Sequence, residues 1–258
     1  MSVLIFNGVT SASVHAHITE PPEYTIPERD YDTIHIDGRN GDLVIDSGVY
    51  NNVDRKYKMS MDATSSTLDY ISVPSSIATW LHPNPLTTNS DGGYYKLTDT
   101  YDPSHFRYAR FKGDEDISNI FEKAGEFDLT FDCKPQRYLT SGETAVTISS
   151  SGQTLTNPTS QIAKPIITFN STSNGGWVQI TNSAYGVTFR ATCTTTGTQI
   201  VDCENEDCYN GSTNRNLYVT FLYNGNTSYV FPLLYPGTNT ITYSAASSIT
   251  IKPNWWEL

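Results

Sequence analysis

The sequence predicts a mainly β protein with two domains, and three observations support this. Residues that favour strands are frequent, with 17 Tyr and 12% aromatic residues, and only one segment has a helical pattern. Short apolar runs alternate with Gly, Asn and Pro turn signals along most of the chain. The 258 residues suffice for one large β domain or two smaller ones, and a change in composition favours two.

The two parts of the chain differ in charge. Residues 1–140 contain 12 Lys/Arg and 21 Asp/Glu, a balance of −9, and residues 141–258 contain 4 and 6, a balance of −2. We therefore expect domains at 1–140 and 141–258. Residues 138–160 carry few large apolar side chains and are interpreted as a linker or a loose first strand. The net charge of −11 argues against a surface that holds nucleic acid phosphates.

In the first part, apolar runs between turn signals predict strands. Pro21 and Pro22 interrupt regular structure, so residues 19–33 are expected to form an extended loop or arm. Residues 127–132 alternate strictly, which is typical of a half-buried strand. The other strands are expected at 3–6, 106–111 and 117–121.

One short helix is predicted in this part, over residues 74–81. Serines at its beginning are assigned to the N-cap, where a hydroxyl can accept a hydrogen bond from a free amide. Pro83 and Pro85 end the helix, because proline has no amide hydrogen to donate.

The second part has strand patterns throughout. Asn224, Gly225 and Asn226 predict a hairpin between strands at 217–223 and 229–231. Several short strands at regular spacing, with Gly and Asn turns between them, indicate a β-sandwich. The remaining strands are expected at 165–169, 177–180, 241–243 and 248–251.

Motifs for catalysis or metal binding are few. The sequence contains no G-x-S-x-G, H-E-x-x-H or G-x-x-x-x-G-K-[ST] motif. His15 and His17 are expected on one strand face, but two ligands alone do not make a metal site. The acidic segment 202–208 lacks the Gly and Glu positions of a calcium loop, so we expect a solvated loop. We predict no catalytic residue, no cofactor and no metal site.

The four cysteines are too few for a disulfide framework in a chain of this length. The sequence has no secretory signal and no apolar run that could span a bilayer. We therefore expect synthesis in a cytoplasm, free thiols and no membrane partner. The sequence leaves open whether Cys203 and Cys208 pair in an oxidising exterior.

Residues 38–42, Gly-Arg-Asn-Gly-Asp, support two interpretations. An arginine between glycines, with Asp37 and Asp42 beside it, could belong to an anion-binding or catalytic loop. Apolar residues alternate on both sides of the segment, however, and Asn-Gly is a strong signal for a short hairpin turn. Gly38 permits a bulge or a positive φ. We favour a hairpin whose charges lie in solvent.

Two aromatic residues of the second part are candidates for carbohydrate contact. Trp177 and Tyr185 could stack on sugar rings if their side chains are exposed. An aromatic residue in a strand more often belongs to the core, which is the alternative interpretation. Paired carboxylates for glycoside hydrolysis are not located by any pattern in this sequence.

Four stretches occur in a recognisable order. The first is residues 26–52, with Gly-Arg-x-Gly before an acidic strand, and the second is 75–84, with Trp-Leu in a short helix. The third runs from 99–111 to 126–138 and contains Phe-x-Cys-Lys-Pro near its end. The fourth joins 201–210 to 231–243, and the latter contains Phe-Pro-x-Leu-x-Pro-Gly-x-Asn. Together they make the chain similar to the siphophage distal tail protein (Dit) family of phages and prophages of Gram-positive bacteria. The resemblance covers nearly the whole chain.

The resemblance implies a structural protein of the virion tail tip, not an enzyme. It implies a tail-tube-like domain at 1–140 that forms a hexameric ring, with a channel for DNA and the tape-measure protein, and a galectin-like β-sandwich at 141–258. Other implied partners are the major tail protein, the tail-associated hub protein and the receptor-binding protein. In such a ring, the hairpin residues become candidates for contact between subunits: Gly38, Arg39, Asn40, Gly41 and Asp42.

An alternative function follows from the galectin-like second domain. The protein could be an adhesin that recognises glycan of the host cell wall. Exposed aromatics above polar groups in a groove would favour this function, whereas rings of six subunits would favour the tail-tip adaptor.

Overall fold

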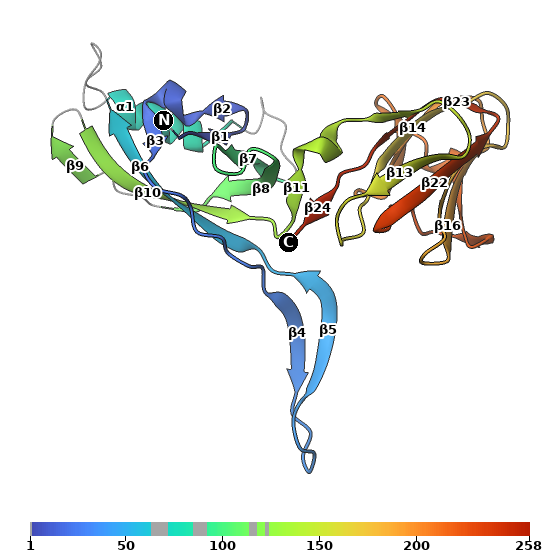
Figure 1. The fold of residues 1–258 in the computed structure, drawn as a ribbon, viewed down its shortest axis with the longest axis horizontal. Coiled ribbons are helices and arrows are strands. Elements are labelled where there is room, and N and C mark those ends of the chain that lie inside the picture. The colour runs from blue at the N-terminus through green and yellow to red at the C-terminus, as the bar shows by residue number, and fades with distance from the viewer. Residues whose placement is uncertain (1, 63–71, 85–91, 114–117, 122–123) are drawn as a thin grey trace. The chain divides into compact units, whose positions relative to one another are not determined.

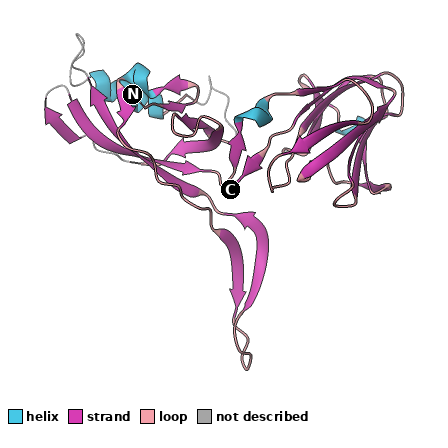
Figure 2. Ribbon diagram, in the orientation of Figure 1, coloured by secondary structure: helices cyan, strands magenta, loops and turns pink. Residues whose placement is uncertain are grey.

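The computed structural model describes residues 2–62, 72–84, 92–113, 118–121 and 124–258. The chain divides into two compact units, residues 1–137 with Leu258 and residues 138–257 (Figure 1). Strands dominate both units, and the described residues contain one α-helix (Figure 2). This confirms the mainly β fold class. None of the helices in the described residues is long and apolar enough to cross a membrane.

The first unit is built on an antiparallel sheet in the order β2-β1-β7-β8-β10-β6-β3. A bridge between Ser2 and Ile18 brings the start of the chain beside β3, so the sheet curls back on itself. Another strand, β9, pairs with β10. The bounds are β1 (Leu4–Phe6), β2 (Val9–Thr10), β3 (Ala16–Ile18), β6 (Val53–Asp62), β7 (Tyr95–Asp99), β8 (His105–Phe111), β9 (Ser118–Phe121) and β10 (Ala124–Cys133), with the 3-10 helix η1 (Ser11–Val14) before β3.

Strand β10 supplies the centre of the first core. Phe127, Leu129 and Phe131 are all at most 5% exposed, which confirms the alternation that the sequence predicts. The ring of Phe131 lies 5.1 Å from Phe6 and 6.0 Å from Tyr57, between centroids. Strands far apart in the sequence therefore meet on this one side chain.

The helix α1 (Ser72–Leu81) begins two residues before the predicted start. Ser76 and Thr79 lie inside it, and their hydroxyls donate to the carbonyls four residues earlier. The assignment of serines 75 and 76 to the N-cap is therefore wrong. The apolar face of α1 joins the core, and the Trp80 Nε1 donates to the carbonyl of Val9 at 3.1 Å.

A separate two-stranded sheet is formed by β4 (Arg29–Ile34) and β5 (Leu43–Tyr50). We call residues 29–50 the arm hairpin; it extends beyond the larger sheet of the first unit (Figure 1). Residues 19–28 lead into it without regular secondary structure. The predicted extended loop at 19–33 thus continues as a strand from Arg29.

The second unit is a β-sandwich of two antiparallel six-stranded sheets. Their inner faces share one hydrophobic core, which includes Phe169, Ile180 and Ile241. One sheet has the order β12 (Val146–Ile148), β23 (Ala246–Lys252), β14 (Ile166–Ser171), β17 (Gly197–Asp202), β18 (Asp207–Asn210), β19 (Thr213–Asn214). The other has β13 (Gln153–Asn157), β22 (Gly237–Ser244), β15 (Gly176–Asn182), β16 (Val187–Cys193), β20 (Val219–Tyr223), β21 (Asn226–Ser228).

The remaining elements are short. They are β11 (Arg137–Leu139), which pairs with β24 (Trp256–Glu257), and the 3-10 helices η2 (Thr140–Glu143) and η3 (Asn216–Tyr218).

Two local interpretations of the second part need correction. For residues 138–160 the linker interpretation is wrong and the strand alternative holds, because β12 pairs with β23 and β13 pairs with β22. Residues 229–231 are not a strand; the partner of β20 is Asn226–Ser228. Asn224 and Gly225 form a two-residue turn with φ of 47° and 81°. The predicted hairpin is present, but it is shorter than expected.

Candidate functional site

The tip of the arm hairpin is an eight-residue loop, residues 35–42, between the paired residues Ile34 and Leu43. Gly38 and Gly41 have φ of 79° and 80°, whereas Asn40 is not among the residues with positive φ. An Asn-Gly turn of the short kind needs positive φ at both positions. The predicted hairpin exists, but its turn is longer than the sequence indicates.

Polar contacts hold the shape of the arm hairpin. The Arg29 Nε lies 2.8 and 2.7 Å from the two carboxylate oxygens of Asp46, and its Nη1 donates to the Tyr50 hydroxyl at 2.9 Å. The hydrogen bond from Arg29 lowers the pKa of Asp46. At the tip, His35 Nδ1 lies 2.9 Å from Asp42. Arg39 is exposed and has no ion-pair partner in the described part of the chain.

Both faces of the arm hairpin expose apolar side chains. Cross-strand pairs place Val44 on one face and Ile34 and Ile45 on the other. An isolated two-stranded hairpin is marginally stable in water, and clustered exposed apolar residues mark contact surfaces. The exposed fractions are Tyr31 52%, Ile34 45%, Ile36 40%, Val44 56%, Ile45 47% and Val49 55%. The arm hairpin therefore has the properties of a segment that a protein partner covers.

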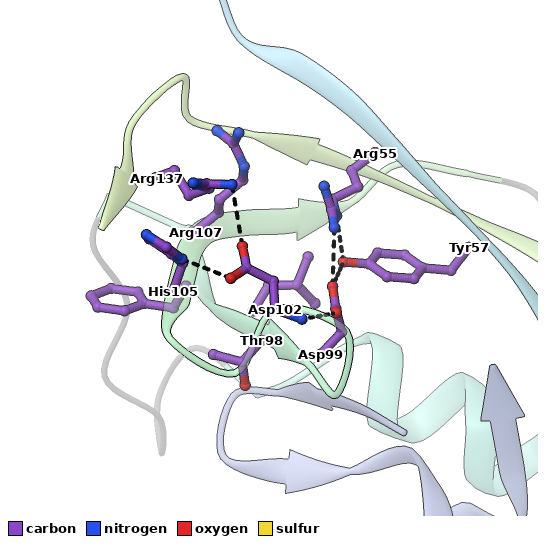
Figure 3. A pocket seen from close by; sticks show the side chains of 10 residues that line it. Arg55, Tyr57, Thr98, Asp99, Asp102, His105, Arg107 and Arg137 are labelled. Atoms are coloured by element: carbon purple, nitrogen blue, oxygen red, sulfur yellow. Dashed lines mark hydrogen bonds and ion pairs between the residues drawn. The ribbon is translucent and has the colours of Figure 1, made fainter. Parts of the chain in front are cut away.

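A second candidate is a cluster of charged residues in the first unit (Figure 3). Asp99 is 6% exposed. Its carboxylate accepts hydrogen bonds from Arg55 Nη2 at 3.1 Å and the Tyr57 hydroxyl at 2.9 Å. The amides of Tyr101 and Asp102 also donate to it, at 2.9 and 3.0 Å. Asp99 thus links β6 and β7 to the turn that follows β7.

Asp102, Ser104 and His105 form a group that superficially resembles a catalytic triad. Asp102 and Ser104 both contact the same nitrogen of His105, Nδ1, at 2.7 and 3.0 Å. A triad needs the serine and the carboxylate on opposite nitrogens of the ring. The cavity leaves about 20 Å³ free, which holds about one water molecule. We infer that the cluster stabilises the fold.

The two aromatic candidates lie in different surroundings. Trp177 is half-buried on β15, and the guanidinium of Arg190 lies 4.1 Å above its ring centre. Tyr185, in the turn between β15 and β16, is 53% exposed, and its ring packs 5.1 Å from Tyr235. The rings of Trp177 and Tyr185 do not pack against each other, so the structure does not assemble them into one stacking platform.

The histidines and cysteines offer no site within the described residues. His15 adopts a left-handed conformation at the end of η1, whereas His17 lies in β3, so the expectation of a shared strand face is wrong. The described part of the chain has no group of three potential metal ligands. All four cysteines are free and buried. Burial raises the pKa of Cys133 and of Cys208 to about 12, which keeps both thiols protonated and unreactive.

Sequence reasoning missed one polar residue, Arg190, which lies beside Trp177. It is the one charged residue in the six strands of its sheet. The signal was present as a lone arginine in Val187–Cys193, VTFRATC, a strand otherwise made of Thr and apolar residues. Its neighbours across the sheet became visible only in the fold.

No family model and no curated protein sequence matches this chain. Among solved structures, the crystal structure of Dit (gp 19.1) of phage SPP1 is similar, with a TM-score of 0.66 at 15% sequence identity. The match covers 97% of this chain and 98% of that chain. SPP1 Dit is described as a paradigm of the hub adsorption apparatus in phages that infect Gram-positive bacteria. The likeness confirms the Dit-like fold that the sequence resemblance implies.

Proposed function

We propose that the chain, which has the fold of SPP1 Dit, is a distal tail protein of a phage or prophage of a Gram-positive bacterium. Six copies form a ring at the virion tail tip that joins the tail tube to the adhesion apparatus. Similarity to a hub protein over 97% of the chain is the observation that carries this proposal. The first unit forms the ring, and the second, as a galectin-like sandwich, faces the adhesion apparatus.

The arm hairpin supports a role in assembly. A closed ring is built from heterologous contacts, in which one surface of a subunit meets a different surface of the next. The exposed apolar residues of β4 and β5 supply such a surface. Arg39 lies at its tip beside Gly38, Asn40, Gly41 and Asp42, and forms an ion pair with a carboxylate of the neighbouring subunit.

The charge of the first part suits a channel for DNA. The balance of −9 over residues 1–140, from 12 basic and 21 acidic residues, repels phosphates, so DNA passes without being held. The ring contacts the major tail protein, the tape-measure protein, the tail-associated hub protein and the receptor-binding protein. Synthesis and assembly take place in the host cytoplasm.

The proposal is tested by light scattering and negative-stain imaging of the purified protein. We expect rings of six subunits with a central hole. A protein that stays monomeric at every concentration, alone and mixed with the tail-tube protein of the same phage, would contradict the proposal.

The role of Arg39 is tested by R39A. We expect the variant to dissociate at a protein concentration at least tenfold higher than the parent, because one intersubunit ion pair is lost. Its unfolding temperature should be unchanged. K252A, on β23 of the second unit, removes one positive charge elsewhere and should leave the ring intact. If R39A rings are as stable as those of the parent, the proposed ion pair of Arg39 is refuted, but the proposal of a hexameric ring is not.

A further inference from the structure

The outward face of the sheet β13-β22-β15-β16-β20-β21 is covered by hydroxyl groups. Register places ten threonines on this face, while the alternate residues, such as Val178, Ile180 and Phe189, are buried. We call it the threonine face; it consists of Thr154, Thr156, Thr181, Thr188, Thr192, Thr220, Thr227, Thr238, Thr240 and Thr242, with Trp177, Gln179, Arg190 and Leu222 among them.

Arg190 is held in a fixed position at the centre of the threonine face. Its Nε and Nη2 donate to the side-chain oxygen of Gln179 at 2.9 and 2.7 Å. Its guanidinium lies 4.1 Å from the ring centre of Trp177. Both partners are neutral, so they orient the arginine without neutralising it. Its Nη1 donates to no acceptor among the described residues.

The charge of Arg190 is unopposed on this face. None of the six strands of the sheet contains an Asp or Glu. The acidic cluster of the second unit, residues 202–207, lies in the other sheet, at the turn between β17 and β18. The chain as a whole has a net charge of −11, yet the partners of Arg190 are neutral. A guanidinium pairs with carboxylate or phosphate, so Arg190 can bind an oxyanion.

A hollow of about 450 Å³ lies beside Arg190 and is lined by Gln179, Thr188, Leu222, Asn224 and Gly225. This volume is in the range of small-molecule sites. Hydroxyl groups both donate and accept hydrogen bonds, so a threonine surface matches a ligand that carries many hydroxyls. We propose that the threonine face binds an anionic carbohydrate, a sugar or sugar-alcohol chain bearing carboxylate or phosphate, with Arg190 holding the anion.

A protein partner fits this face less well. Binding hot spots of protein interfaces are enriched in Trp, Tyr and Arg, and Thr is under-represented among them. On the threonine face the one large aromatic side chain, Trp177, has a ring surface covered by Arg190. All residues of the threonine face belong to the second unit, so binding there does not require ring formation.

The test is calorimetric titration of the full chain with four probes. They are oligogalacturonate, glycerol phosphate oligomers, a neutral maltooligosaccharide and polyglutamate. We expect binding of one or both charged carbohydrates, at least tenfold tighter than the neutral one, and weaker binding at high salt. The probe that binds identifies the anion as carboxylate or phosphate. Equal binding of polyglutamate, or no binding of either charged carbohydrate, would overturn the proposal.

Two variants locate the site. R190Q should weaken binding at least tenfold, while K164Q, which removes a positive charge before β14 of the other sheet, should change it less than twofold. L222D places a carboxylate directly across from Arg190 in register and should also weaken binding tenfold, although it leaves the arginine in place. Unchanged affinity in R190Q and L222D, measured on variants with the parent's unfolding temperature, would place the binding elsewhere and refute the proposal.

Discussion

Asp132 shows how single residues in the first unit are stabilised by their partners. It is 7% exposed and lies at the end of β10. Its carboxylate accepts hydrogen bonds from Asn52 at 3.0 Å, Tyr94 at 3.0 Å and Arg110 at 2.7 Å. Burial opposes its ionisation, but the hydrogen bonds from Arg110, Asn52 and Tyr94 outweigh burial and lower the pKa of Asp132.

The lowered pKa makes the contribution of Asp132 to stability depend on pH. Because the folded-state pKa lies below the unfolded value of about 3.9, the stabilisation is present above about pH 4 and is lost as pH falls through the folded-state pKa. We expect D132N to lower the free energy of unfolding by about 1–2 kcal/mol at pH 7. The difference from the parent should shrink as pH falls from about 5 to 2.

Urea unfolding over this pH range measures the effect. D128N, an exposed position on the same strand, serves as the control and should change stability little at any pH. A difference between D132N and the parent that stays constant down to pH 2 would show that the carboxylate charge is not responsible.

At the scale of elements, the same dipeptide behaves differently in two hairpins. Asn224-Gly225 forms a tight turn. The amide of Asn224 donates to the carbonyl of Thr188, and the amide of Thr188 donates to the Asn224 Oδ1, both at 2.8 Å. Asn40-Gly41 lies within a longer loop, and of these two residues only Gly41 has positive φ. Asn-Gly forms a two-residue turn only where the residues directly before and after it are paired across the hairpin, as Tyr223 and Asn226 are.

The two asparagines therefore predict different costs of substitution. N224A should lower the free energy of unfolding of the second unit by about 1–2 kcal/mol, because alanine is strained at φ of 47° and the contact to Thr188 is lost. N40A should change the free energy of unfolding of the first unit by less than about 0.5 kcal/mol. Scanning calorimetry of both variants measures this. Equal effects would contradict the turn assignments.

At the scale of the whole molecule, each unit has a core of its own. The buried cluster around Phe131 and the cluster around Phe169 contain no common residue. The second unit spans residues 138–257, a length at which single domains fold alone.

We expect a polypeptide of residues 138–257 to fold without the first unit. Its own core contains the apolar side chains that drive cooperative folding. Circular dichroism during thermal unfolding should show one sharp transition. A broad, non-cooperative loss of signal would show that the sandwich needs the first unit. The full chain, measured in parallel, provides the reference temperature.

Local patterns in the sequence were enough to predict several elements. Alternation over residues 127–132 identified β10 and its buried face, because side chains of a strand point to opposite sides in turn. Asn224-Gly225 identified a hairpin, and Pro83 marked the end of α1 closely. Each of these signals depends on neighbours within a few residues, so it can be read without the fold.

Other features depend on partners that are distant in sequence. Residues 146–148 look like a linker, yet they pair with 249–251, about a hundred residues later. The exposure of β4 and β5 and the acid-free surroundings of Arg190 likewise depend on which strands become neighbours. Sheet pairing is a long-range property, because backbone hydrogen bonds can be made with any strand of suitable register. Composition and spacing therefore predicted a mainly β chain, and strand pairing determined which of its surfaces stay exposed.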